Sequence, residues 1–136
     1  MRTSPQEARS AIERARVARL ATASRDARPH VVPITFAAQA DRIVTAIDHK
    51  PKSTRNLLRL RNIADNPNVA VLADHYEDDW SRLWWARADG VAEVTDAASH
   101  PDLAAALTEK YEQYRQQPPA DLLIVIHVQR WSGWHG

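Results

Sequence analysis

Three strand-like segments follow one another in residues 17–47, whose sequence is VARLATASRDARPHVVPITFAAQADRIVTAI. The first covers 17–24, the second 29–36 and the third 42–47, and only short turns separate them. Branched side chains fill the second segment and favour the half-buried surface of a strand. No helix fits between the segments, so a doubly wound parallel sheet is excluded. The stretch predicts a meander of three antiparallel strands.

On both sides of this stretch, capping signals and apolar residues at helical spacing predict helices. Ser4-Pro5-Gln6-Glu7 has the pattern of a capping box with proline at the first helical position, and it predicts a helix over 4–16. A second helix is expected from Ser53 or Thr54 to Asn66-Pro67. A third is expected over 101–115, where apolar side chains form one stripe.

Three more strands are expected in the second half of the chain, over 69–73, 83–94 and 122–128, the last extending toward Trp131. Residues 69–73 are all apolar, so burial on both faces is expected. Gly90 is expected to mark a β-bulge, and His127, inside an apolar strand, is expected in the core. The whole pattern predicts a mainly β single domain over 1–136, a six-stranded antiparallel barrel with helices packed outside.

The composition excludes several kinds of function. The 136 residues include no cysteine, which excludes disulfides, thiolate metal sites and a cysteine nucleophile. The three glycines cannot build a glycine-rich phosphate loop. A net charge of +1 gives no indication of general nucleic-acid binding, and no apolar run approaches the length of a membrane span. We therefore expect a cytoplasmic protein that binds neither nucleic acid nor membrane.

A basic cluster precedes and enters the second expected helix. Residues 50–61 contain five cations and no anion. Cations at a helix N-terminus oppose the helix dipole, whereas a bound anion would remove the conflict. The cluster therefore predicts an anion site, and a solvated helix face is the alternative.

Tryptophans gather in two places, around residues 80–85 and at Trp131 and Trp134. Adjacent residues of a strand point to opposite faces, so Trp84 and Trp85 cannot both enter one small core. At least one of them should cover a ligand, a partner chain or a helix. Packing in the core or in a dimer interface is the plainer interpretation for most of the five.

No catalytic residue can be named from the sequence. His75 with the nearby acidic residues matches no zinc motif, so no metal site is predicted. A GxSxG elbow for a nucleophilic serine is also missing.

Three stretches carry a family resemblance. Residues 18–23 (ARLATA) and 28–34 (RPHVVPI) resemble the opening of the pyridoxamine 5′-phosphate oxidase-like split β-barrel proteins. Residues 60–69 (LRNIADNPNV), after the basic segment, are similar to their basic helix and "NPxV" strand entry. Residues 75–90 (HYEDDWSRLWWARADG) resemble an actinobacterial subgroup that uses the deazaflavin coenzyme F420. The resemblance spans about residues 6 to 135.

The resemblance implies a homodimer of the FMN-binding split-barrel type, with a flavin or deazaflavin between the subunits. It implies that the cofactor phosphate meets Lys50, Lys52, Ser53, Thr54 and Arg59. It also implies that the ring lies along Val32, Pro33, Ile34 and Thr35, with Tyr76, Trp80 or Trp84 lining the groove.

By this resemblance the protein is an F420-dependent oxidoreductase that transfers a hydride to a small unsaturated or nitro-type substrate. Three alternatives stay open. The same barrel could use FMN, it could bind a flavin or deazaflavin without catalysis, or the tryptophans could serve a purely structural dimer.

Overall fold

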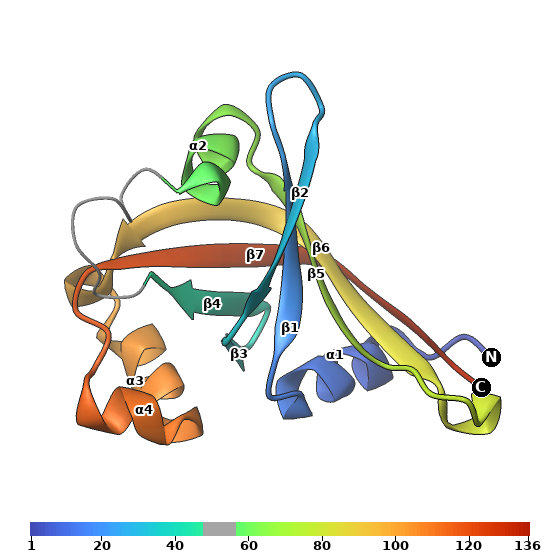
Figure 1. Cartoon of the computed structure of the whole chain (residues 1–136). Helices are drawn as coiled ribbons and strands as arrows, with labels where there is room; N and C mark the ends of the chain where they lie inside the picture. Colours follow the sequence, from blue (N-terminus) through green and yellow to red (C-terminus); the bar gives the residue numbers. More distant parts are fainter. Residues whose placement is uncertain (48–56) are drawn as a thin grey trace.

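The computed structural model describes residues 1–47 and 57–136. Figure 1 shows the path of the chain and the labels used below. The main elements are α1 (Pro5–Arg14), β1 (Ala18–Ala23), β2 (Pro29–Ile34), β3 (Ala37–Gln39), β4 (Arg42–Ala46), α2 (Leu58–Asp65), β5 (Asn68–His75), β6 (Trp84–Asp96), α3 (Pro101–Lys110), α4 (Glu112–Gln116) and β7 (Leu122–His135). Two short 3₁₀ turns, η2 (Trp80–Arg82) and η3 (Ala97–Ser99), flank β6.

Among the described residues, seven strands form one antiparallel sheet in the order β2-β1-β5-β6-β7-β4-β3. The long strands β6 and β7 run side by side through its centre, and the helices lie outside the sheet (Figure 1). This confirms the mainly β, antiparallel fold with outer helices. The sheet has seven strands rather than the six predicted.

The predicted meander of three strands is confirmed in its first pairing, β1 with β2, and wrong in its second. Residues Ala37–Gln39, expected as a turn, form β3 and pair with β4 across the loop Ala40–Asp41. β4 also pairs with β7, not with β2. Beside β7 both faces of β4 are covered, because Ile43 packs in the inner core cluster and Val44 packs against helix α3. β2 has an exposed face instead and lies at the edge of the sheet.

Two clusters of buried side chains stabilise the fold. The larger one fills the inside of the curved sheet and includes Leu20, Phe36 and Ile126. The smaller one lies between the outer face of β4 and β7 and helix α3, and includes Val44, Leu103, Leu107, Leu123 and Val125. Helices therefore cover the outer face of the sheet at the β4–β7 end.

A β-bulge lies at Gly90, as predicted, but its extra residue is on the partner strand β7. The β6–β7 register shifts between Asp89 and Gly90, so that Asp89 faces Arg130 and Gly90 faces Val128, leaving Gln129 unpaired. A Cβ atom on Gly90 would lie 2.4 Å from the carbonyl oxygen of His127. The glycine is required because the two backbones approach so closely here.

Two predictions of burial are wrong. β5 was expected to be buried on both faces, but Val69, Val71 and Ala73 are buried while Ala70 and Leu72 are half-exposed. His127 is exposed rather than in the core, and its Nε2 lies 3.3 Å from Glu93 Oε1. In both strands only one face meets the interior of the sheet, and nothing among the described residues covers the other face at these positions.

The helices predicted from capping and apolar spacing are confirmed only in part. The capping box is confirmed, because Ser4 Oγ accepts from the Glu7 amide and Glu7 Oε1 accepts from the Ser4 amide. The helix predicted over 101–115 is broken at Tyr111, whose backbone is extended. The expected start of the second helix falls outside the described residues, and α2 is described from Leu58. No helix in 1–47 or 57–136 is long and apolar enough to span a bilayer.

Candidate functional site

Strand β2, predicted to lie against a cofactor ring, is an edge strand of the sheet. One set of its backbone N–H and C=O groups therefore faces away from β1. Its side chains alternate, with Pro33 and Thr35 exposed, Val32 partly buried and Ile34 buried in the core. The backbone and the exposed side chains of this segment can face a ligand, but the Ile34 side chain cannot.

The end of β2 is held by several groups from other elements. Thr45 Oγ1 donates to the carbonyl oxygen of Thr35 at 2.7 Å, and the Thr35 and Tyr114 hydroxyls lie 3.1 Å apart. The Phe36 amide donates to the Tyr111 hydroxyl at 3.1 Å, which in turn donates to the Arg16 carbonyl at 2.8 Å. These bonds fix where β2 ends, and they explain why the helix breaks at Tyr111.

The same junction contains a lysine in an apolar setting. The Lys110 Nζ lies 3.9 Å from the centroid of the Phe36 ring. Burial, and to a lesser degree the nearby Arg16, lowers the pKa of the Lys110 ammonium from 10.5 to about 8. Burial also raises the pKa of the Tyr111 hydroxyl. Both side chains contact the Phe36 segment, so they belong to the support of β2.

Most of the predicted phosphate ligands cannot be placed. Lys50, Lys52, Ser53 and Thr54 lie outside the described residues. Arg59, the other member of the set, is half-buried in the first turn of α2. That helix is fixed to β1 by a buried hydrogen bond from Asn62 Nδ2 to Thr22 Oγ1 at 3.0 Å.

The predicted aromatic residues lie far from α2 within one chain. Trp80, which is 77% exposed, belongs to η2, and Trp84 begins β6. The eight residues of β5 separate α2 from this end of the sheet, a span of roughly 26 Å at about 3.3 Å per residue. Figure 1 shows α2 and η2 at opposite ends of the molecule. One chain therefore does not bring Trp80 and Trp84 together with Arg59.

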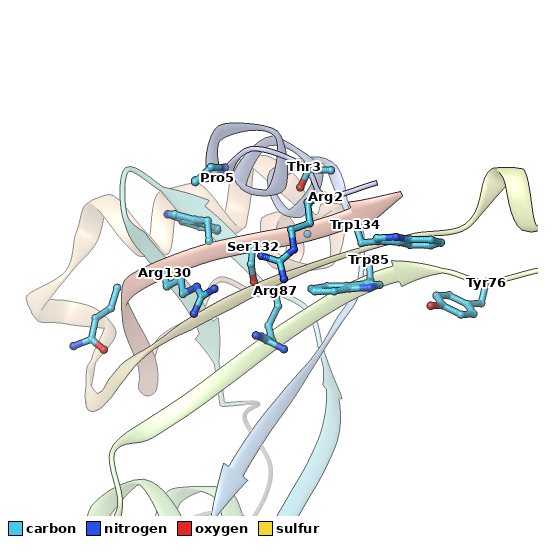
Figure 2. A pocket seen from close by; sticks show the side chains of 12 residues that line it. Arg2, Thr3, Pro5, Tyr76, Trp85, Arg87, Arg130, Ser132 and Trp134 are labelled. Carbon is cyan, nitrogen blue, oxygen red and sulfur yellow. The ribbon is translucent and has the colours of Figure 1, made fainter. Parts of the chain in front are cut away.

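A separate hollow of about 790 Å³ lies on the outer face of β6 and β7 (Figure 2). We call it the Trp–Arg hollow. Arginines, aromatic side chains and small polar residues line it: Arg2, Thr3, Pro5, Tyr76, Trp85, Arg87, Gln129, Arg130, Trp131, Ser132, Gly133 and Trp134. Among the described residues that line it there are three arginines and no carboxylate.

The register of β6 and β7 builds this hollow. Trp85 pairs with Trp134 and Arg87 pairs with Ser132, so all four side chains leave the same face of the sheet. Arg2 joins them because the Thr3 amide donates to the Gly133 carbonyl at 3.1 Å and extends the sheet by one bridge. Figure 2 shows the Trp85 and Trp134 indoles at one side and the arginines beside them.

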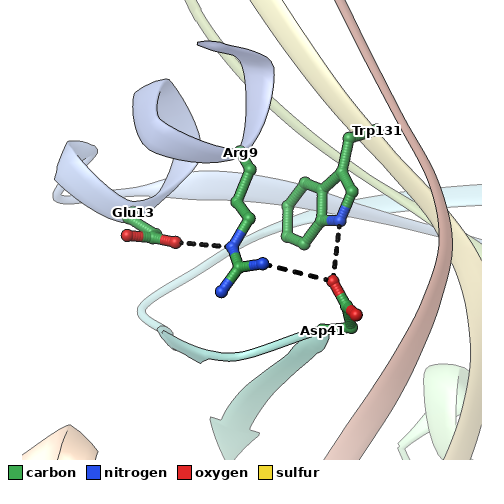
Figure 3. Close-up of polar contacts among 4 residues, drawn as sticks. All are labelled: Arg9, Glu13, Asp41 and Trp131. Atoms are coloured by element: carbon green, nitrogen blue, oxygen red, sulfur yellow. Dashed lines mark hydrogen bonds and ion pairs between the residues drawn. The ribbon is translucent and has the colours of Figure 1, made fainter. Parts of the chain in front are cut away.

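Trp131 is oriented by a polar network behind the hollow (Figure 3). Its Nε1 donates to Asp41 Oδ1 at 3.3 Å, and Arg9 Nη1 lies 3.4 Å from the same oxygen. Arg9 Nε also donates to Glu13 at 2.9 Å. Exposed ion pairs of this kind add little stability, so the network mainly fixes how α1, the β3–β4 loop and β7 meet.

Sequence reasoning missed the hollow as a site. The alternation in β6 places Trp85 and Arg87 on one face, and this signal could have suggested a mixed aromatic and cationic surface. Arg2 and Arg130 could not have been added, because their positions depend on pairing between distant segments. The division between Trp84 and Trp85 is confirmed, since Trp84 packs against the inner core and Trp85 lines the outer hollow.

The family model described as pyridoxamine 5′-phosphate oxidase matches residues 4–135. The chain belongs to this family. Its antiparallel sheet with outer helices is thus a split barrel of the pyridoxamine 5′-phosphate oxidase type, as the resemblance in sequence implied.

Solved structures of the same fold are similar to this family member at low sequence identity. A FAD-binding protein from Mesorhizobium loti superposes with a TM-score of 0.74 at 20% identity, covering 98% of this chain and 93% of the other. The FAD-binding protein from Mycobacterium smegmatis superposes with a TM-score of 0.65 at 19% identity, covering 98% of this chain and 96% of the other. The heme storage protein HutZ from Vibrio cholerae superposes with a TM-score of 0.71 at 20% identity, covering 99% of this chain and 95% of the other. No curated protein matches the sequence.

Proposed function

We propose that this protein is an oxidoreductase that uses the deazaflavin coenzyme F420 and transfers a hydride to a small unsaturated or nitro-type substrate. The proposal rests on one structural observation within a chain of the pyridoxamine 5′-phosphate oxidase family. The segment Val32–Thr35 comprises the end of the edge strand β2, one set of whose backbone groups faces away from β1, and the residue after it, and its end is held by Thr45 and Tyr114. Similar folds in a FAD-binding protein from Mesorhizobium loti and another from Mycobacterium smegmatis support a flavin-type ligand.

The residues of β2 and α2 fit a flavin or deazaflavin ring with its phosphate. The outward backbone groups of β2 can donate to and accept from the polar edge of a planar heterocycle, and the exposed Pro33 and Thr35 leave its face accessible. Arg59 stands in the helix that follows the basic segment, where Lys50, Lys52, Ser53 and Thr54 would meet the phosphate. A bound deazaflavin supplies a carbon centre that gives and takes a hydride, and the protein supplies orientation.

The support of β2 matters for this role. Tyr111, Tyr114 and Thr45 fix two consecutive residues at its end. A strand held this firmly keeps a ring at a constant position relative to a second ligand, which hydride transfer requires.

The proposed assembly is a homodimer. The outer face of β2, β1 and β5 is open, and it joins apolar side chains, Val31 (59% exposed), Ala21, Ala70 and Leu72, with the charged Arg19, Asp74 and Arg87. No described residue covers this face, and such open apolar surfaces mark interaction sites. A second copy of the chain is the proposed partner, so that the same patch is used twice around a two-fold axis.

A charge change on the open face tests the homodimer. Val31→Lys is expected to give monomers in sedimentation at micromolar concentration, because it places an ammonium in the buried patch. Val94→Lys, on a half-exposed residue outside the face, is the matched control and should leave the dimer intact. A wild-type protein that sediments as a monomer would contradict the proposal.

Titration of the purified protein with F420 and, separately, with FMN tests the cofactor. The double variant Lys50→Ala, Lys52→Ala is expected to bind F420 at least about tenfold more weakly, since two charge-assisted phosphate contacts are lost. The control Arg25→Ala, Arg28→Ala removes the same charge from the β1–β2 turn and should bind normally. A clear preference for FMN would exclude the deazaflavin, and binding of neither cofactor would refute the proposal.

Catalysis needs its own measurement. Reduced F420 is mixed with the protein and a panel of conjugated and nitro compounds, and reoxidation is followed by absorbance. Turnover supports the oxidoreductase. Tight binding without turnover across the panel supports the alternative of a non-catalytic flavin or deazaflavin carrier.

A further inference from the structure

We propose that the Trp–Arg hollow is a binding site for a planar aromatic or conjugated carboxylate. That this ligand is the substrate to be reduced rests on the function proposed above. The site itself rests on three features of the hollow: positive charge that is only partly compensated, flat aromatic walls, and buried hydroxyl groups without partners among the described residues.

Positive charge in the hollow is only partly balanced. Arg87 Nε lies 3.2 Å from Asp89, which is the one ion pair that the described residues offer to the three arginines. No carboxylate in 1–47 or 57–136 forms an ion pair with Arg2 or Arg130. Guanidinium groups that share one hollow repel one another, and a bound carboxylate relieves the repulsion while accepting two parallel hydrogen bonds.

Aromatic walls favour a flat ligand. Trp85 and Trp134 are cross-strand partners, and both are only partly buried. The Arg87 guanidinium already stacks on Trp85, with Cζ 5.6 Å from the ring centroid. Indole faces beside cations bind planar conjugated groups by stacking, so the ligand should be flat as well as anionic.

Two hydroxyl groups in the lining lack partners. Thr3 Oγ1 and Ser132 Oγ are buried, and neither has a hydrogen-bond partner among the described residues. Buried hydroxyl groups are normally satisfied, and rotation of either side chain toward the hollow would let a carboxylate oxygen accept from it. A hydrocarbon without an acceptor, or an ammonium ion, would leave these groups unpaired.

The hollow is distinct from the proposed cofactor strand in one chain. No residue of β2 or α2 lines it. Arg87 lines both the hollow and the open apolar face, so a second copy on that face also borders the hollow.

Binding of naphthalene-2-carboxylate without any cofactor tests the site by calorimetry, with the neutral naphthalene-2-carboxamide as the matched ligand. We expect one acid per chain and at least tenfold weaker binding of the amide. Arg130→Gln and Arg2→Gln should each weaken acid binding about fivefold, the effect of one partly exposed ion pair. Arg28→Gln, the same charge change on an exposed turn, should have no effect. Equal affinity for acid and amide, or equal losses in all three variants, would overturn the site.

A second titration, with F420 or FMN present, distinguishes a failure of the carboxylate site from a failure of the proposed redox function. Simultaneous binding of acid and F420, with a preference for acid substrates in kcat/KM that Arg130→Gln reduces, supports the substrate assignment. Competitive displacement of the acid by F420 or FMN would overturn it, because the hollow would then belong to the cofactor. Acid binding in a protein that binds neither cofactor supports the anion site and refutes only the redox function.

Discussion

Replacing Lys110 with methionine should stabilise the protein. The Lys110 Nζ is buried over the Phe36 ring and has no hydrogen-bond partner among the described residues. Methionine has nearly the same length, keeps the contact with the ring and carries no charge. The substitution therefore removes the desolvated charge without opening a cavity.

The expected gain follows from the pKa. A fall in the Lys110 pKa from 10.5 to about 8 corresponds to at most about 3.5 kcal/mol, at roughly 1.4 kcal/mol per pH unit. Because the side chain is half-exposed, solvent screening reduces this penalty to about 1–2 kcal/mol. The lost attraction between the ammonium and the ring offsets part of it. We expect Lys110→Met to raise the free energy of unfolding by about 1 kcal/mol at pH 7.

The gain should depend on pH in a defined direction. Between the folded pKa of about 8 and the unfolded value of 10.5, the unfolded chain binds more protons, so wild-type stability from this group rises with pH. Below pH 8 both states are protonated and the full penalty is present. The advantage of Lys110→Met should therefore be constant below about pH 8 and shrink toward pH 10.5.

Urea unfolding at a fixed protein concentration, followed by tryptophan fluorescence at pH 7 and pH 10, measures this difference. Lys110→Arg keeps the charge and serves as the control, with no gain expected at either pH. A Lys110→Met variant that is less stable than wild type at pH 7, or whose advantage does not fall at pH 10, would refute the reasoning.

Three further changes test the fold. Gly90→Ala should cost about 2–3 kcal/mol in urea unfolding, because the new Cβ meets the His127 carbonyl; a cost below about 0.5 kcal/mol would contradict the close approach of the two backbones. Asn62→Ala should cost about 1–3 kcal/mol by leaving the buried Thr22 hydroxyl unpaired, and the double variant with Thr22→Val should recover part of the loss. Ala40→Gly should stabilise by about 0.5 kcal/mol, since φ is 55° there, whereas Ala38→Gly in the extended β3 should destabilise; the reverse order would disprove the strain.

Local signals in the sequence were reliable where the structure depends on neighbours along the chain. The Ser4–Glu7 capping box and most strand segments are set by groups a few residues apart. The family resemblance carried by residues 18–34 and 60–90 is likewise confirmed by the family model. The F420 assignment, the phosphate ligands and the homodimer stay predictions.

Pairing between distant segments was decided only by the tertiary structure. β4 joins β7 rather than β2 and has both of its faces covered there, and Tyr111 breaks a helix to bond the Phe36 amide. Likewise, His127 and Leu72 leave the interior because one side of their strands stays open. The sequence determined which segments are strands and helices, since period and capping are local. Cross-strand register joins residues that are far apart in the chain. It decided which faces of the strands meet, and therefore where Arg2, Arg87 and Arg130 gather.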